Sequence, residues 1–357
     1  MGEVNEVDDA VSARKAKRQE MKGRFWVAVI IFFIGLWLRF DCYQTKHPDQ
    51  DELFELSSIL GKDAGTVFDN KAFYGDHTSF PGEYILYFVP IKMMGWDVKP
   101  PSIDVGRMEV AGVKRNDFLK LAVVKVILWV ISFWLLYSVC VSRMSAWGTV
   151  LTMAIYGFNF QLVYHAFEAR PYSVLPVLAV LNLWLSLRKY KTFGAVLHVI
   201  TIFFTCIYHA YGPMIAFLPC LFAADKRIFF TVPVALGLWA YYASYSTFGM
   251  TPNGVQSVVG LFQYFPKQNF FENLMVNLSG GSLIFYALVP LLAYTLVRGW
   301  TRADWTFFGV MVALPILLIF LVDWKTHYCF HPRQFVWVIP FFALFCGGQV
   351  DKISKGS

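Results

Sequence analysis

The sequence predicts an all-α polytopic membrane protein, and three observations carry this prediction. Hydrophobic residues make up 57% of the 357 residues. Charged residues make up 15%, whereas an ordinary soluble domain carries roughly 25%. Apolar runs recur along nearly the whole chain, with no long polar stretch to form a separate soluble domain. We therefore expect one membrane domain over residues 25–347, preceded by a cytoplasmic leader, 1–24, and followed by a cytoplasmic tail, 348–357.

The apolar runs predict about ten transmembrane helices. A helix needs about 20 mostly apolar residues to cross a bilayer, and fewer where the protein thins the membrane. The first run follows a basic leader and lacks a small-residue cleavage site, so we expect it to stay as an anchor. The ten runs are 25–40, 118–140, 147–164, 172–187, 193–208, 213–223, 228–246, 283–297, 305–322 and 335–347.

The positive charges predict the orientation of these helices, because cytoplasmic loops collect Lys and Arg. With a cytoplasmic N-terminus and ten crossings, the clusters at 188–191, 225–227 and 298–302 and the C-terminus all fall on the cytoplasmic side. A further apolar stretch, 84–95, must then not cross. It is too short for a span, and we place it as an interfacial or re-entrant helix within a large outer loop, 41–117. The net charge of +7 therefore reflects topology rather than nucleic-acid binding.

This topology gathers the polar residues of interest on the outer, non-cytoplasmic face. Ionisable groups at membrane depth are costly and usually line a cavity, so their convergence predicts a site there. The densest acidic segment follows the first run and contains Asp49, Asp51, Glu52 and Glu55. On a helix that starts near Asp49, Asp51 and Glu55 share a face. The alternative interpretation is an N-cap with an acidic first turn that the helix dipole stabilises.

Two further segments supply cations at outer mouths of predicted spans. Arg170 precedes Pro171, which suits the first turn of a helix, so Arg170 lies where it can meet an anion. Before the last run, four candidate cations occur within nine residues, among them Lys325, His331 and Arg333. As alternatives, Arg170 pairs with Glu168 or extends to lipid headgroups, and the later cations are interfacial anchors.

These residue types suit transfer of a sugar from a phosphate. A sugar phosphate leaves as a stable anion, so no general acid is required. What remains is a carboxylate that accepts a proton and cations that hold the phosphate, which Arg does with two parallel hydrogen bonds. Glycine-rich nucleotide loops do not occur in the sequence, which argues against a nucleotide sugar or ATP as donor. No cofactor or metal site is predicted from the Cys and His spacing, and a divalent metal stays open.

The order of these motifs resembles the GT-C superfamily of membrane glycosyltransferases. The motifs are the first span, the acidic segment at 51–56, the segment 77–86, the segment 168–173, the segment 209–212 and the segment 333–340. Within the superfamily, the likeness is to the protein O-mannosyltransferase and lipid A aminoarabinose transferase type. Two departures concern the donor contacts: the usual His-Pro-Pro segment is spread over 77–81, and the usual terminal Arg-Tyr reads Arg333-Gln334.

The resemblance implies an inverting glycosyltransferase that moves a sugar from a polyprenyl-phosphate carrier to a hydroxyl of a glycan, lipid or protein. The reaction would occur on the periplasmic, luminal or extracellular face, as in assembly of cell envelope glycans. By resemblance, Asp51 takes the catalytic position, with Glu52 beside it. Candidate donor phosphate contacts are Arg170, Arg333, His331 and Lys325, and candidate substrate contacts are Asp49, His77, Glu168 and His209.

Two other classes of function stay open. A transporter or flippase for a lipid-linked or anionic substrate would also carry charges in the membrane, though typically with internal repeats and charges near the midplane. We find no repeat, and the charges gather at one rim. A non-catalytic assembly subunit would tolerate substitution of Asp51, Glu52 and Arg170 together. We expect a glycosyltransferase.

Overall fold

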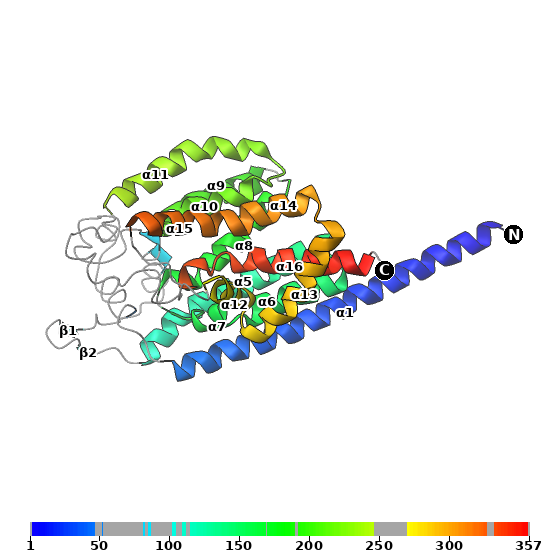
Figure 1. Cartoon of the computed structure of the whole chain (residues 1–357), viewed down its shortest axis with the longest axis horizontal. Coiled ribbons are helices and arrows are strands. Elements are labelled where there is room, and N and C mark those ends of the chain that lie inside the picture. Colours follow the sequence, from blue (N-terminus) through cyan, green and yellow to red (C-terminus); the bar gives the residue numbers. More distant parts are fainter. Residues whose placement is uncertain are drawn as a thin grey trace.

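The computed structural model describes residues 2–46, 52, 81–82, 85–86, 102–104, 109–111, 115–168, 170–189, 192–245, 270–326 and 332–355. The described part is largely helical, and most helices run side by side along one axis (Figure 1). They are α1 (Gly2–Thr45), α5 (Arg115–Arg143), α6 (Ala146–Phe158), α7 (Phe160–Tyr164), α8 (Leu175–Ser186), α9 (Thr192–Tyr208), α10 (Gly212–Cys220), α11 (Val232–Tyr245), α12 (Phe270–Ser279), α13 (Ser282–Gly299), α14 (Arg302–Phe308), α15 (Leu314–Thr326) and α16 (Ile339–Lys355).

Each of the ten predicted runs contains helix in the structure. Four helical segments have by themselves the length and hydropathy of a membrane span: Gln19–Thr45, Ala122–Arg143, Ser282–Gly299 and Arg302–Leu321. The last of these joins α14 to α15 through a π-helical turn, Gly309–Ala313. Short 3-10 turns at Pro171–Ser173, Lys226–Thr231 and Pro332–Phe335 precede α8, α11 and α16. That all ten runs cross the membrane stays a prediction.

Two features differ from the expected pattern, and a third lies outside the described residues. Within the predicted outer loop, β1 (Ser102–Asp104) pairs antiparallel with β2 (Glu109–Ala111), where only interfacial helices were expected. Helix α12 lies in a segment without a predicted helix. The stretch 84–95 lies almost wholly outside the described residues, so its failure to cross stays a prediction.

The predicted leader and tail are both helical. Helix α1 is continuous from Gly2, because the leader is rich in Ala, Glu, Lys and Arg, which favour helix. Its 44 residues reach about 66 Å at 1.5 Å per residue, and its N-terminal part projects beyond the bundle in Figure 1. Helix α16 likewise continues to Lys355, well into the tail expected at 348–357.

The centre of the bundle is the contact between α6 and α16. Helix α16 runs through the middle of the molecule in Figure 1, and its residues Phe341 and Phe342 are fully buried. A Cβ added to Gly148 would lie 2.5 Å from the carbonyl oxygen of Gly347. Thr152 also donates a hydrogen bond to the carbonyl oxygen of Ala343, at 3.2 Å. The two backbones are therefore in direct contact, with no room for a side chain between them.

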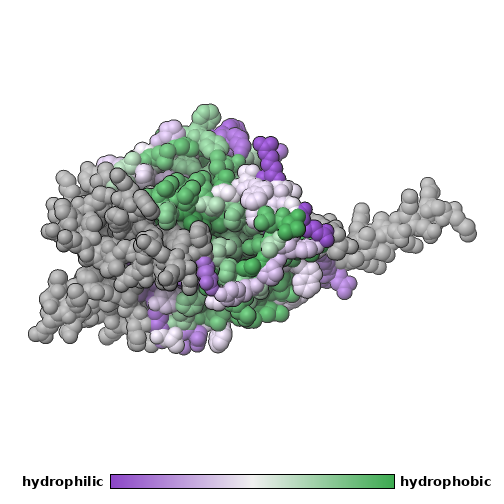
Figure 2. All heavy atoms as spheres, in the orientation of Figure 1, coloured by the Kyte–Doolittle hydropathy of each residue, from purple (hydrophilic) through white to green (hydrophobic). Residues whose placement is uncertain are grey.

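The outside of the bundle is apolar, as expected of a protein in lipid. Large hydrophobic side chains such as Leu283 and Val297 of α13 are more than four-fifths exposed. Figure 2 shows hydrophobic residues over the middle of the visible face and hydrophilic residues toward the ends of the helices. Apolar surface of this extent needs lipid to cover it, so the chain is an integral membrane protein.

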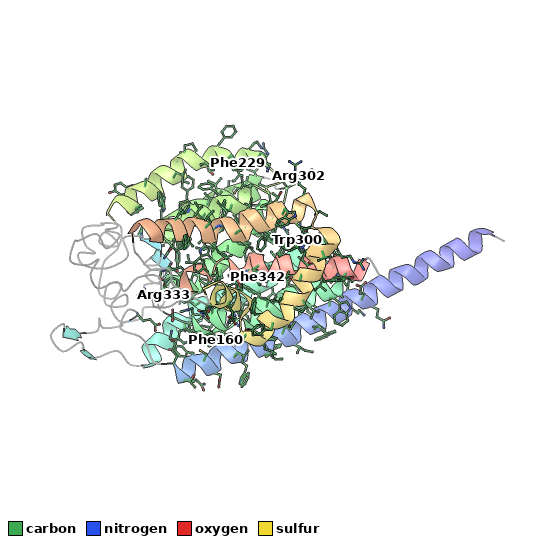
Figure 3. The ribbon with its side chains drawn as sticks, in the orientation of Figure 1. Phe160, Phe229, Trp300, Arg302, Arg333 and Phe342 are labelled. Carbon is green, nitrogen blue, oxygen red and sulfur yellow. The ribbon has the colours of Figure 1, made fainter. Side chains whose placement is uncertain are left out.

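Residues of the predicted leader and tail share one end of the bundle. There, Arg24 donates to the carbonyl oxygen of Met144, the amide of Ser145 donates to Asp351, and Lys352 pairs with Asp304. Figure 3 labels Arg302 and Arg333, which lie toward opposite ends of the bundle. Residues of the predicted leader and tail therefore lie at the same end of the bundle, and which end faces the cytoplasm stays a prediction.

Candidate functional site

A break between α6 and α7 sets up the candidate site. The fully buried Asn159 accepts hydrogen bonds from the backbone amides of Gln161 and Leu162, at 2.9 and 3.2 Å, and so caps α7. Its amide nitrogen donates to the carbonyl oxygens of Asn277 and Leu278 on α12, both at 3.1 Å. This cap directs the short helix α7 toward the turn that carries the candidate residues.

A buried arginine donates hydrogen bonds to carbonyl groups that this break leaves without partners at the end of α6. The last carbonyls of a helix have no partner within it. Arg39 of α1 is fully buried and donates to the carbonyl oxygens of Gly157 and Gly35, at 2.7 and 2.9 Å. Its guanidinium lies 4.1 Å from the centroid of the Trp129 ring. Sequence reasoning missed Arg39, although a charged residue inside the apolar run 25–40 was a signal.

An acidic cluster forms where α1 ends. Lys46 pairs with Glu168 and lies 3.8 Å from a carboxylate oxygen of Glu52. The other oxygen of Glu168 lies 2.7 Å from Nδ1 of His165, whose Nε2 lies 3.2 Å from Oε1 of Gln161. Both carboxylates are almost fully buried. The cluster joins two candidate residues from segments far apart in the sequence, Glu52 and Glu168.

The charges in this cluster support one another. Burial alone would raise the pKa of Glu168, but the hydrogen bond and charge of His165 and the charge of Lys46 outweigh it and lower that pKa to about 2. Burial opposes the charge of Lys46, and the two glutamates more than compensate, so the pKa of Lys46 is raised. Glu168 is therefore a carboxylate held in its charged form.

A cationic cluster surrounds Tyr172, next to the acidic one. The guanidinium carbons of Arg170 and Arg333 lie 5.6 and 5.2 Å from the centroid of the Tyr172 ring. The amide of Gln334 donates to the Tyr172 hydroxyl at 3.3 Å, and the His209 ring lies 6.1 Å from the Tyr172 ring. Three candidate residues, Arg170, Arg333 and His209, therefore lie around the ring of Tyr172.

His209 is a neutral hydrogen-bond donor in this cluster. Burial and, second, the positive charge of Arg170 lower the pKa of His209 to about 3. Its Nδ1 accepts a hydrogen bond from the backbone amide of Tyr211 at 3.2 Å. The single proton of the neutral ring is then on Nε2, because Nδ1 is the acceptor. Together with two arginines, an N–H group of this kind suits a phosphate.

The backbone between the two clusters is fixed by Lys125 of α5. Its ammonium group donates to the carbonyl oxygen of Glu168 and, at 2.9 Å, to that of Arg170. Ser173 donates to the same Arg170 oxygen at 3.1 Å. The 3-10 turn at Pro171–Ser173 then presents Arg170 and Tyr172 on either side of the proline that was expected to open the helix.

The structure brings Glu52, Glu168, Arg170, His209 and Arg333 to one end of the bundle. Four other candidates, Asp49, Asp51, His77 and His331, lie outside the described residues, and Lys325 is in α15 with its side chain outside them. Within the described ranges, no three His, Cys, Asp or Glu side chains come together as a metal site.

Besides Arg39 and Lys125, sequence reasoning missed Lys46, His165 and Tyr172. Each had a local signal. Lys46 lies directly before the acidic segment, His165 lies three residues before Glu168, and Tyr172 belongs to the same motif as Arg170. Only the fold shows which of these local signals converge.

Comparisons with known proteins bear on the fold. No family model and no curated protein matches the sequence. Among solved structures, the fold is similar to the crystal structure of ArnT from Cupriavidus metallidurans in the apo state, with a TM-score of 0.57 and 14% sequence identity. The match covers 94% of this chain and 62% of the ArnT chain, so this chain spans less than two thirds of that protein. The likeness supports the GT-C-like fold that the motifs predict.

Proposed function

We propose that this protein is an inverting membrane glycosyltransferase, which moves a sugar from a polyprenyl-phosphate carrier to a hydroxyl-bearing acceptor. The observation that carries the proposal is the group formed by Arg170, Arg333 and neutral His209 around Tyr172, beside a buried acidic cluster. The fold supports it, because ArnT is a lipid A aminoarabinose transferase of the GT-C type.

The cationic cluster would hold the donor phosphate. As the bond between C1 of the sugar and the phosphate oxygen breaks, negative charge builds on the leaving phosphate. Two guanidinium groups and the Nε2–H of His209 can stabilise that charge in place, without reorganisation of water. A polyprenyl tail would lie in the lipid beside the exposed apolar helices while its headgroup reaches this rim.

The acceptor hydroxyl would lose its proton to a carboxylate, and we assign this role to Asp51. A carboxylate that is paired with a cation is a weaker base. Glu168 is held charged by Lys46 and His165, and Glu52 lies 3.8 Å from Lys46. Those pairings leave Asp51, next to Glu52 in sequence, as the better base, with Asp49 as its competitor. The hydroxyl oxygen then bonds to C1 on the face opposite the phosphate, which inverts the configuration.

The decisive experiment is single-turnover transfer from a lipid-phosphate sugar by purified, folded variants. Asp51→Asn should lose turnover and keep donor binding, because a base acts in the transition state. Asp49→Asn should stay active and nearly as stable as wild type if Asp49 caps a helix, because Asn caps a helix about as well as Asp. A wild-type rate in Asp51→Asn contradicts the assignment, and inactivity of Asp49→Asn alone moves the base to that residue. Movement of the donor across vesicles without transfer would favour a flippase.

A further inference from the structure

A pocket lies at the end of the bundle opposite the candidate site. It is a cavity of about 220 Å³ between the C-terminal ends of α5 and α8, the middle of α16 and helix α14. Most of its wall is apolar, from Leu183, Leu187, Phe222, Phe307, Leu344 and Phe345. Arg143, Asp304 and Gln349 supply its polar side. The pocket therefore has an apolar chamber with charged and polar groups on its wall.

Gln349, which lines this pocket, carries a buried acceptor. The residue is 1% exposed, and its Nε2 donates to a carboxylate oxygen of Asp304 at 3.4 Å. A carboxylate only accepts, so the amide nitrogen must face Asp304 and Oε1 must face elsewhere. Among the described residues, that oxygen has no hydrogen-bond partner. A buried acceptor without a donor is costly, so a bound molecule that offers a hydroxyl or N–H would be favoured here.

Arg143 adds an unpaired positive charge. It is the last residue of α5, its side chain is exposed, and the described part of the chain gives its guanidinium no ion pair or hydrogen bond. The acidic residue of the pocket, Asp304, is already paired with Lys352 and bonded to Thr301 in a capping box. Arg143 is thus available for an anion from outside the chain.

We propose that this pocket binds an anionic phospholipid with a hydroxylated headgroup, such as phosphatidylglycerol. The phosphate would pair with Arg143, a headgroup hydroxyl would donate to Gln349, and part of an acyl chain would fill the apolar chamber. An apolar ligand would leave Gln349 unsatisfied, and a small soluble anion would leave the chamber empty. With the predicted topology, the lipid comes from the cytoplasmic leaflet. The inference does not depend on the proposed transfer reaction.

The test is retention of lipid by the purified, delipidated protein, measured by native mass spectrometry during titration with phosphatidylglycerol or phosphatidylcholine. Wild type should bind phosphatidylglycerol more tightly than phosphatidylcholine. Arg143→Gln and Gln349→Met should each weaken phosphatidylglycerol binding about tenfold, which corresponds to loss of one hydrogen bond. Binding of phosphatidylcholine should weaken in Arg143→Gln, because phosphatidylcholine carries the same phosphate, and should change little in Gln349→Met, because its headgroup has no hydroxyl.

The matched control is Arg188→Gln. Arg188 is also exposed, stacks on Trp184 at 3.9 Å and lies just beyond the C-terminal end of α8. It should bind phosphatidylglycerol as wild type does. Wild-type binding by Arg143→Gln and Gln349→Met would overturn the proposal. An equal loss in Arg188→Gln would overturn it too, because that result describes attraction to a basic surface rather than a pocket.

Discussion

Lys46 and Glu168 form an ion pair that ties the end of the first span to the turn before α8, across 122 residues of sequence. Glu52 joins the same ammonium group at 3.8 Å. Glu52, which follows α1, is thereby joined to the turn that carries Arg170 of the cationic cluster. The pair fixes the position of the acidic cluster relative to the cationic cluster. The proposed transfer between a bound donor and an acceptor would need such a fixed geometry.

Removal of this anchor should destabilise the protein. Lys46→Met leaves two buried carboxylates without their shared cation, and breaking a buried pair on one side costs about 3 kcal/mol or more. Lys352→Met is the control, since it breaks a pair that is more than one-third exposed on the lysine side and should cost about 1 kcal/mol or less. Thermal unfolding in detergent measures both, and similar losses in the two variants would contradict a special role for Lys46.

The free energy of unfolding should decrease as the pH is lowered below about 6.5. The pKa of His209 is lowered to about 3, so between pH 6.5 and 3 the unfolded chain binds a proton that the folded chain does not. The stability linked to the neutral form of His209 is fully present above pH 6.5 and is lost as the pH falls from 6.5 toward 3. Glu168, with a pKa of about 2, adds a second loss only below about pH 4.5.

The variant His209→Asn isolates the first of these two losses. Its unfolding temperature should depend less on pH than that of wild type between pH 5.5 and 6.5, where Glu168 is ionised in both states. Parallel curves for the two proteins in that interval would show that His209 is not held neutral.

Replacement of either arginine of the cationic cluster should weaken use of the donor. Arg170→Lys and Arg333→Lys keep the charge but lose the planar fork that binds phosphate in two places. We expect about a tenfold rise in KM for the lipid-phosphate donor, with the fold retained. An unchanged KM for the donor in both variants would indicate that these two arginines contact lipid headgroups instead.

The predicted orientation can be measured by labelling. A cysteine placed at Lys189, just after α8, should resist a membrane-impermeant reagent in intact cells and react after the cells are opened. The native cysteines are mostly buried, and a variant without them provides the background. Labelling from outside would reverse the topology and place the candidate site in the cytoplasm.

Much of the helical pattern could be predicted from the sequence, because each apolar run is long enough to form helix on its own. The break at Asn159 could not. Its flanking residues are apolar, and the cap depends on carbonyl groups of Asn277 and Leu278, more than a hundred residues away. Apolar periodicity does not contain such a tertiary contact.

The candidate site likewise contains residues that could be predicted from local sequence and residues whose role depends on tertiary contacts. The motifs singled out Glu168, Arg170, His209 and Arg333, since charged and titratable residues are conspicuous at the ends of apolar runs. Tyr172 was not singled out, because an aromatic residue beside a span is ordinary. Its role depends on Arg333 and His209, which reach its ring from different parts of the chain.

The glycine contact between α6 and α16 constrains how the proposed donor, with its long polyprenyl tail, would reach the candidate site from the side. Gly148 and Gly347 let two backbones touch, so these helices cannot slide or part without the loss of close-packed contacts along their length. Helix α13 is different: within it, only Leu288 and Thr295 are buried. Entry of such a tail would therefore cost least free energy through movement of loosely packed helices at the perimeter, such as α13, while α6 and α16 stay in place.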